Sequence, residues 1–436
     1  MSKTTPAPPY PVPPKPSHQY WIPVSLHAPP PPPSEPLEHL PAGQDASGRT
    51  LRIALAMKGG VSLAVWIGGG VAEIDVLRRI RIRRVDEEDR AFFAFAVPSS
   101  EKDVTGYLMR HAPLFDRAAV YARALHSRGF DEVEVDVLTG ASAGGLNAVL
   151  YSVAQRSGAD VDSLIGTWLD GGAIDRLLWT PGTRRVDSAL RGDAFFWPTV
   201  HGALKSFRAS PDVARHHDVA ADDVVVDLSA TLINPGLHDD HATRDGRGHL
   251  RFLGRKADPV HGRKIPGLFD EATERPGDLV RLAYAARTTS SFPGAFEPAI
   301  IASIADQPAP LPNDEAPDMS RVFAAHRTPR PDGRTEPYRV MDGGVLDNIP
   351  IERVLRSIRR QPADRFSARA LIYLDPSPDD PRGSWRAPEP FVPANAFNPQ
   401  PRTREDRTSR LSAVVSLALK KRKGRENTYD KLDEIG

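Results

Sequence analysis

The sequence predicts an α/β fold built around a mostly parallel sheet, and two observations support this prediction. Short apolar segments typical of buried strands alternate along the chain with longer segments typical of helices. Two of the strand-like segments also pass through a turn of small residues directly into a helix-like segment. This β-loop-α, α, β-turn-α order favours an α/β domain in which most strands run parallel.

The elements follow in order from the first apolar segment. Leu51–Met57 is predicted to be a buried strand because it is short, apolar and flanked by glycines. Residues 59–84 indicate a glycine turn and one long helix, and residues 85–111 a polar, irregular insertion. Residues 173–207 fit no clean period, and residues 305–337 are expected to form a surface loop. Further helices are predicted at Phe115–Arg128, Ala143–Arg156, Leu279–Ala286 and Ile351–Arg360, and further strands at Val133–Gly140, Val224–Ile233, Tyr338–Gly344 and Ala370–Pro376.

Two flanking segments are expected to lie outside the core. Residues 1–48 are proline-rich, with a run at Pro29–Pro33, and are predicted to be an extended, disordered arm. Residues 377–436 are irregular and rich in Pro and Arg, and they end in Leu411–Arg425, where an apolar run joins a basic cluster. This pattern suits an interfacial helix on an anionic membrane, and an ordinary helix with a solvated basic end fits it equally well.

The composition disfavours nucleic-acid binding and excludes chemistry that depends on cysteine. The 57 Lys and Arg residues balance the 56 Asp and Glu residues to a net charge of +1, so overall charge does not favour nucleic-acid binding. The chain has no cysteine, which excludes disulfides, thiolate metal sites and cysteine nucleophiles. The N-terminus has no secretory apolar region, and no apolar run approaches the ~20 residues of a spanning helix. The expectation is a cytoplasmic protein that can touch a membrane at its periphery.

The segment DVLTGASAGGLNAVLY contains a candidate nucleophile, Ser142. Gly140 and Gly144 flank it in a G-x-S-x-G pattern between a predicted strand and a predicted helix. A sharp strand-to-helix turn would expose Ser142 Oγ at the carboxyl edge of the sheet, and it tolerates only small neighbours. The alternative is a glycine-rich helix start that packs tightly on a strand.

A serine nucleophile needs a base, and Asp342 is the best candidate. The usual α/β-hydrolase order of Ser, Asp or Glu, then His is not favoured, because the last histidine, His326, lies in a polar loop region. Asp342 ends an apolar strand and precedes two glycines, which allow the carboxylate to approach a neighbour closely. Asp347 is a weaker competitor further into the turn, and Asp342 as a simple turn former remains an alternative. An esterase with an upstream histidine is a further alternative.

Gly59 and Gly60 form a candidate oxyanion hole after the first predicted strand. Glycines at a strand-to-helix turn expose backbone N–H groups, which can hold a developing negative charge. A phosphate cradle is the alternative, but the Gly-x-Gly-x-x-Gly and Walker patterns are absent from the sequence here.

These three elements in this order resemble the patatin-like phospholipases. The resemblance covers roughly residues 51–376 and includes ARTTSSFPGAFEP at 286–298 and DGGVLDNIP at 342–350, with Gly343 and Gly344 after the aspartate. The family implies a three-layer α/β/α sandwich over a catalytic domain at 49–376 and a Ser142–Asp342 dyad without histidine. It also implies a Gly59–Gly60 oxyanion hole and hydrolysis of lipid acyl esters without metal or cofactor.

The sequence departs from the family in its glycine loop. Lys58 stands at the position of the first glycine and Ser62 at that of the usual basic residue, so KGGVSLAVWIGGG resembles a divergent bacterial branch. Lys58 is a candidate replacement for the missing cation. The departure also suggests an alternative function, a catalytically weak lipid-binding or regulatory module on the same fold. Four aromatic residues are expected to line a lid or groove, or to pack in the core: Trp179, Phe195, Phe196 and Trp197.

Overall fold

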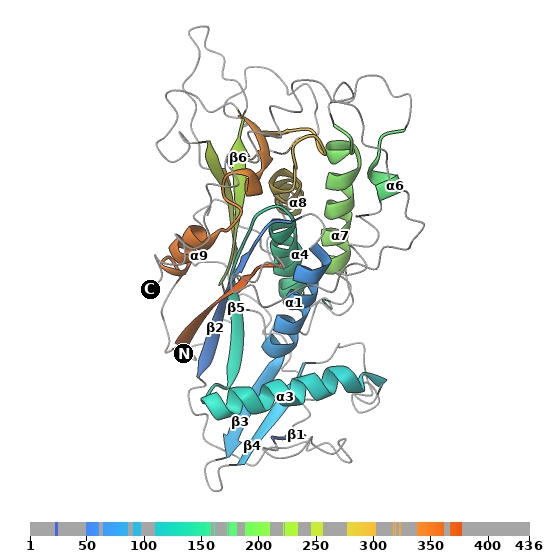
Figure 1. The fold of residues 1–436 in the computed structure, drawn as a ribbon. Helices are drawn as coiled ribbons and strands as arrows, with labels where there is room; N and C mark the ends of the chain where they lie inside the picture. Colours follow the sequence, from blue (N-terminus) through green and yellow to red (C-terminus); the bar gives the residue numbers. More distant parts are fainter. Residues whose placement is uncertain are drawn as a thin grey trace, which may run out of the picture.

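A mixed β-sheet runs through the protein, and helices lie against both of its faces in the computed structural model (Figure 1). The structure describes residues 22–24, 49–60, 64–85, 90–96, 110–157, 161, 172, 174–180, 188–209, 221, 223–233, 246–255, 277–301, 317, 319, 322–323, 338–361 and 367–376 of the 436. The predicted interfacial segment at 411–425 therefore lies outside the described residues, as does His326.

The sheet combines a parallel centre with antiparallel margins. Its strands are β1 (Ile22–Pro23), β2 (Thr50–Met57), β3 (Ile80–Val85), β4 (Arg90–Phe95), β5 (Glu132–Gly140), β6 (Asp223–Leu232), β7 (Arg247–Arg255), β8 (Ala299–Ile301), β9 (Tyr338–Asp342) and β10 (Ser367–Leu374). The order β10-β2-β5-β6 is parallel throughout. β7 and β9 both run antiparallel to β6, and β8 runs antiparallel to β9.

The prediction of a mostly parallel sheet is therefore wrong. Adjacent strands that follow each other closely in the chain, such as β3 and β4 or β6 and β7, pair antiparallel, because only parallel pairs require a long crossover. The element order predicted the parallel centre, but it contained no information on the direction of the short marginal strands.

The α-helices of the described residues are α1 (Ala64–Arg78), α3 (Ala112–Arg128), α4 (Ala143–Ser157), α6 (Ile174–Leu177), α7 (Trp197–Ala209), α8 (Gly277–Thr289) and α9 (Ile351–Ile358). Five of them, all except α3 and α6, cover the parallel centre of the sheet from its two sides. Within the described residues, α9 packs Ile351 and Val354 against Ala54, Ala56 and Val137 on one face. α1, α4, α7 and α8 lie on the other face (Figure 1). β2 is mostly apolar, as expected of a strand buried on both faces, whereas β5 places Glu134 and Asp136 between valines, and these buried carboxylates pair with Arg52 and Arg369.

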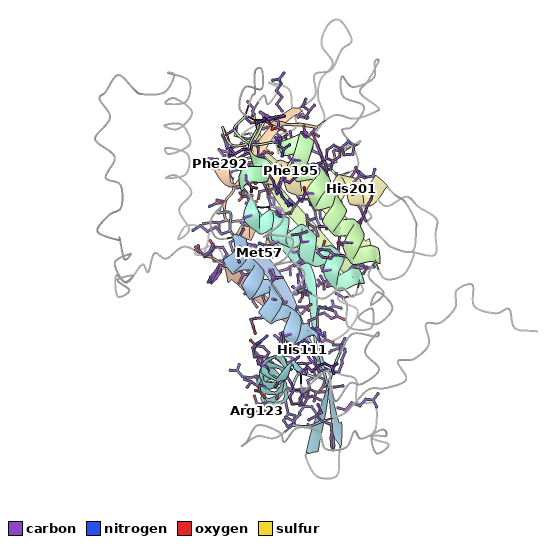
Figure 2. The ribbon with its side chains drawn as sticks, turned by 90° about the vertical axis from the view of Figure 1, so that its right-hand side faces the viewer. Met57, His111, Arg123, Phe195, His201 and Phe292 are labelled. Atoms are coloured by element: carbon purple, nitrogen blue, oxygen red, sulfur yellow. The ribbon has the colours of Figure 1, made fainter. Side chains whose placement is uncertain are left out.

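The sheet extends beyond the amino ends of β2 and β5. There β1 pairs with β4, β4 with β3 and β3 with β5, and α3 lies beside β3 and β4 (Figure 1). Phe93 of β4 stacks on Phe115 of α3, with 6.0 Å between the ring centroids. Figure 2 shows His111 and Arg123 of α3 at the opposite end of the molecule from Phe195 and Phe292.

Strands β3 and β4 show that two expectations from the sequence were wrong. The long helix predicted over residues 59–84 ends at Arg78, and Ile80–Val85 is a strand in which apolar and arginine residues alternate. The insertion predicted at 85–111 contains strand β4, whose Ala91, Phe93 and Phe95 pack in the core. Strand β3 alternates apolar and arginine residues over too few positions to stand out beside a helix, and in β4 the apolar run Ala91–Phe95 is equally short.

The region without a clean period, residues 173–207, also has structure. It contains α6, a π-helical turn at Gly192–Phe196 and the start of α7. The π-helical turn explains the missing period, because its spacing of side chains differs from that of an α-helix. Of the proline-rich segment 1–48, Ile22–Pro23 is described, as the two-residue strand β1 on β4.

Candidate active site

Ser142 occupies the sharp turn between β5 and α4. Its φ of 52° is the one positive value recorded for a non-glycine residue in the described part of the chain. The left-handed region is unfavourable for a residue with a Cβ atom, so the surrounding structure must hold it there. The serine is 6% exposed and lies at the carboxyl edge of the parallel strands.

The glycines around Ser142 stand where no side chain fits. A Cβ atom on Gly140 would lie 2.4 Å from the carbonyl carbon of Gly144. A Cβ atom on Gly144 would lie 2.3 Å from the carbonyl oxygen of Met57, at the end of β2. The G-x-S-x-G spacing thus reflects close packing of the first turn of α4 against two strand ends.

The end of helix α8 holds the serine backbone. The Ser142 N–H donates to the Thr289 carbonyl oxygen at 3.1 Å and to Thr289 Oγ1 at 3.2 Å. Thr289 Oγ1 donates in turn to the Ser229 carbonyl oxygen of β6 at 2.7 Å. Ser290 Oγ donates to the Ser142 carbonyl oxygen at 3.1 Å. The strained turn is therefore fixed from the side by a neighbouring helix.

Asp342 ends β9 and lies buried beside the same helix end. Its N–H donates to the Ser291 carbonyl oxygen at 2.9 Å, and its Oδ1 accepts from the Gly344 N–H at 2.7 Å. The residue is 2% exposed. A Cβ atom on Gly343 would lie 2.2 Å from the Ser229 carbonyl oxygen, so this turn also requires glycine.

Ser142 and Asp342 are thus brought to one place although 200 positions separate them in the numbering. Consecutive residues make the link, because Ser290 bonds to Ser142 and Ser291 bonds to Asp342. The backbones of the two residues therefore meet on one short segment, Ser290–Ser291.

Asp347, the weaker competitor in the sequence, has a different environment. Arg353 Nε lies 2.7 Å from Asp347 Oδ2, which also accepts from Ser229 Oγ at 3.1 Å. A carboxylate committed to a buried arginine is a poor proton acceptor. The geometry therefore favours Asp342 over Asp347 as the base.

The glycine loop after β2 lies directly against the serine. A Cβ atom on Gly59 would lie 2.9 Å from Ser142 Cβ. The Gly59 N–H donates to Asn348 Oδ1 at 3.1 Å, and Gly60 follows it in the loop. Lys58, the departure from the family pattern, places Nζ 3.0 Å from Asp375 Oδ2 after β10. Ser62 lies outside the described residues.

The four aromatic residues divide between core and surface. Phe196 stacks on Phe296 at 5.2 Å, and Trp197 meets the edge of Tyr284 at 5.0 Å. Both are buried, so core packing explains them. Trp179 and Phe195 are partly exposed, and a role at a substrate groove stays a prediction for these two.

A buried ion cluster anchors this aromatic segment to α8, and the sequence analysis missed it. Arg287, 0% exposed, places Nε 2.7 Å from Asp193 and Nη2 3.1 Å from Glu297. Burial raises the pKa of Glu297, but Arg287, the Asp193 amide and the Ser188 hydroxyl outweigh it, so the pKa lies below its usual value. Arg287 and Glu297 flank the segment TTSSFPGAF, and their separation gave no indication of a pair.

Comparison with known proteins identifies the family of the chain. The sequence model of the patatin-like phospholipase family matches residues 117–355, which is more than half of the chain and includes Ser142 and Asp342. The chain belongs to the patatin-like phospholipase family. Its mixed α/β architecture is consistent with that family's fold.

A relative of this patatin-like chain is known from Mycobacterium tuberculosis (strain ATCC 25618 / H37Rv). It is described as uncharacterized membrane protein Rv3479, and it is 29% identical over 361 residues, or 80% of this chain. The chain spans 29% of the length of that relative. None of the helices in the described residues is long and apolar enough to cross a membrane.

Proposed function

We propose that this patatin-like protein is a serine acyl hydrolase that cleaves phospholipid or other lipid acyl esters and releases fatty acid. The observation that carries the proposal is the placement of Ser142, in a strained positive-φ turn, beside Asp342 through the Thr289–Ser291 segment. Family membership supports lipid ester hydrolysis as the reaction class.

The proposed reaction proceeds in two steps. Ser142 Oγ attacks the ester carbonyl while Asp342 accepts the hydroxyl proton, and that proton passes to the departing alcohol. The backbone amides of the Gly59–Gly60 loop stabilise the negative charge on the tetrahedral oxygen. Asp342 then accepts a proton from a water molecule whose oxygen attacks the acyl-enzyme, and passes that proton to Ser142 Oγ as the acyl–Oγ bond breaks, which releases the fatty acid and restores the Ser142 hydroxyl.

The same proposal extends to the architecture. The catalytic domain is residues 49–376, with the layers of a three-layer α/β/α sandwich, and the reaction needs neither metal nor cofactor. Peripheral contact with an anionic membrane through Leu411–Arg425 belongs to this proposal as well.

A catalytically weak lipid-binding or regulatory module is the second candidate. The observation that favours it is the Gly59 N–H, which donates to Asn348 Oδ1 instead of pointing to an empty site. The ion pair of Lys58 with Asp375 adds to this, because it turns the loop's cation toward β10.

Reaction with a fluorophosphonate probe separates the two candidates. We expect wild-type protein to be labelled and to release fatty acid from mixed phospholipid vesicles. Ser142→Ala and Asp342→Asn should lower both rates by more than about 10³-fold, because the two residues act as a unit. Asp347→Asn is the matched comparison, since it neutralises a buried aspartate five residues away and should slow labelling far less than Asp342→Asn.

Three results would contradict the proposal. Folded wild-type protein that neither labels nor hydrolyses supports the binding module. Loss of labelling in Asp347→Asn but not in Asp342→Asn would reassign the base. Loss of activity in His326→Ala with retained folding would favour an esterase that uses histidine.

A further inference from the structure

Asn348 lies in a slot between two glycines that belong to different loops of the site. A Cβ atom on Gly59 would lie 2.4 Å from Asn348 Oδ1, and a Cβ atom on Gly344 would lie 2.6 Å from the same oxygen. The side chain is buried, at 7% exposure for the residue. Both glycines are therefore needed to leave room for this one carboxamide.

Each glycine also touches one member of the proposed dyad. The Cβ position of Gly59 is 2.9 Å from Ser142 Cβ, and that of Gly344 is 3.0 Å from Asp342 Oδ1. Asn348 thus connects the loop beside the nucleophile with the turn that holds the base. These loops follow different strands, β2 and β9, and the sheet alone does not fix the distance between them.

The hydrogen bonds show how Asn348 holds the glycine loop. Asn348 Oδ1 accepts the Gly59 N–H at 3.1 Å, and the Asn348 carbonyl oxygen lies 3.4 Å from the same nitrogen. Asp347, one residue earlier, is held by Arg353 and by its own N–H to the Gly343 carbonyl oxygen at 2.9 Å. Asn348 is therefore presented to Gly59 from a rigid turn.

The residue type fits the position for three reasons. Alanine would leave the partly buried Gly59 N–H without this acceptor and would open a void. Glutamine would be one methylene too long for the slot. Aspartate would keep the acceptor but add a negative charge beside Asp342. Asparagine provides a neutral acceptor of the right length.

We propose that Asn348 is a positioning residue for acyl transfer, which sets the Gly59–Gly60 amides relative to Ser142 and Asp342. This inference rests on the proposed hydrolase function. It revises the proposed oxyanion hole in one respect: the Gly59 N–H holds the loop through Asn348, and the Gly60 N–H alone is the loop's donor to the tetrahedral oxygen.

The first test compares Asn348→Ala with Gln155→Ala. Gln155 is also a fully buried carboxamide, but it bonds to the Val135 carbonyl oxygen near the far end of α4. Asn348→Ala should lower the fluorophosphonate labelling rate and kcat for a soluble ester by about 10- to 10²-fold with little change in KM, because misplacement of catalytic groups lowers the rate of the chemical step. Gln155→Ala should lower the thermal midpoint and leave the labelling rate near that of wild type.

The second test uses Asn348→Asp and the pH dependence of labelling. The added carboxylate keeps the acceptor for Gly59 but disfavours the ionised form of Asp342, whose pKa should rise. The acidic limb of the labelling rate should therefore move to higher pH, with activity partly restored relative to Asn348→Ala at the alkaline end. The added charge would move this limb whatever the role of Asn348, so the deciding result is the recovery of the labelling rate over Asn348→Ala at the alkaline end, which restoring the Gly59 acceptor predicts.

A third measurement does not depend on activity. Gly344→Ala should lower the thermal midpoint more in wild type than in the Asn348→Ala background, since truncation removes one of the two atoms that Cβ would meet. If the two substitutions lowered the thermal midpoint additively, the claim that Gly344 leaves room for the Asn348 side chain would be wrong. If wild type is labelled and Asn348→Ala is labelled equally fast, the positioning role of Asn348 is wrong but the hydrolase proposal stands. If folded wild type is never labelled, the hydrolase proposal is wrong as well.

Discussion

The two ends of the parallel strands β2 and β5 are built from different kinds of contact. At the amino end, side chains connect the strands, as where Arg52 Nε lies 3.1 Å from Glu134 Oε2. At the carboxyl end, backbone meets backbone, and a Cβ atom on Gly144 would lie 2.3 Å from the Met57 carbonyl oxygen. Many residue pairs can replace an ion pair, but only glycine allows such close approach. The carboxyl end is therefore the more demanding part of the sheet, and it is also where the proposed reaction takes place.

The largest expected effect comes from adding one methyl group at the carboxyl end. Gly144→Ala should lower the free energy of unfolding by more than about 3 kcal/mol, because the new Cβ must displace backbone atoms of two segments. Urea denaturation measures this change.

Gly129→Ala is the control at the amino end. Gly129 caps α3 with a φ of 77°, and its Cβ would meet the flexible end of the Arg49 side chain at 3.0 Å. The loss there should be about 1–2 kcal/mol, from the left-handed conformation alone. Equal losses at the two positions would contradict the contrast between the ends.

A pair of threonine substitutions sharpens the same contrast. Thr289→Val removes the hydroxyl that joins the Ser142 N–H to the Ser229 carbonyl oxygen, and should lower stability by about 1–3 kcal/mol and slow labelling. Thr50→Val removes a hydroxyl that donates to Glu132 at the amino end. It should lower stability without changing the labelling rate. Slower labelling in both variants would show that the serine responds to general destabilisation.

The smallest predicted effect concerns pH. The pKa of Glu297 is below its reference value of 4.5 in the folded protein, so its contribution to stability is complete above that value and is lost as pH falls through the folded pKa. Glu297→Gln should therefore be less stable near neutral pH and should lose less of its thermal midpoint than wild type in acid. Thermal unfolding between about pH 3 and about pH 7 measures this difference. Parallel losses in the two proteins would contradict the role of the Arg287 cluster.

The parallel centre of the fold was predictable from the sequence. The strands expected at 51–57, 133–140 and 224–233 are confirmed to within a residue or two, because each is a short segment rich in apolar and β-branched residues. Strands β3 and β4 were missed. In β3, arginines stand between the apolar residues of Ile80–Val85, and the helix predicted before this strand was therefore extended over it.

The sequence also predicted where each candidate site residue would stand, but not what holds it there. Ser142 follows β5 and Asp342 ends β9, so a recognisable strand marks each of them, but β9 runs antiparallel to β6 and the rule for parallel strands does not explain how the two ends meet. The contact of Gly59 with Asn348 spans 289 positions and depends on two loop conformations, so no local pattern contains it. The direction of β9, antiparallel to β6, was equally hidden from the order of the elements.

The most direct measurement of the central claim is mass spectrometry of the protein after reaction with a fluorophosphonate. If the carboxyl edge of the sheet is a serine hydrolase site, the intact protein should gain one adduct, and peptide mapping should place it on Ser142. A folded protein that gains no adduct, or gains it on another serine while Ser142→Ala still reacts, would contradict the account.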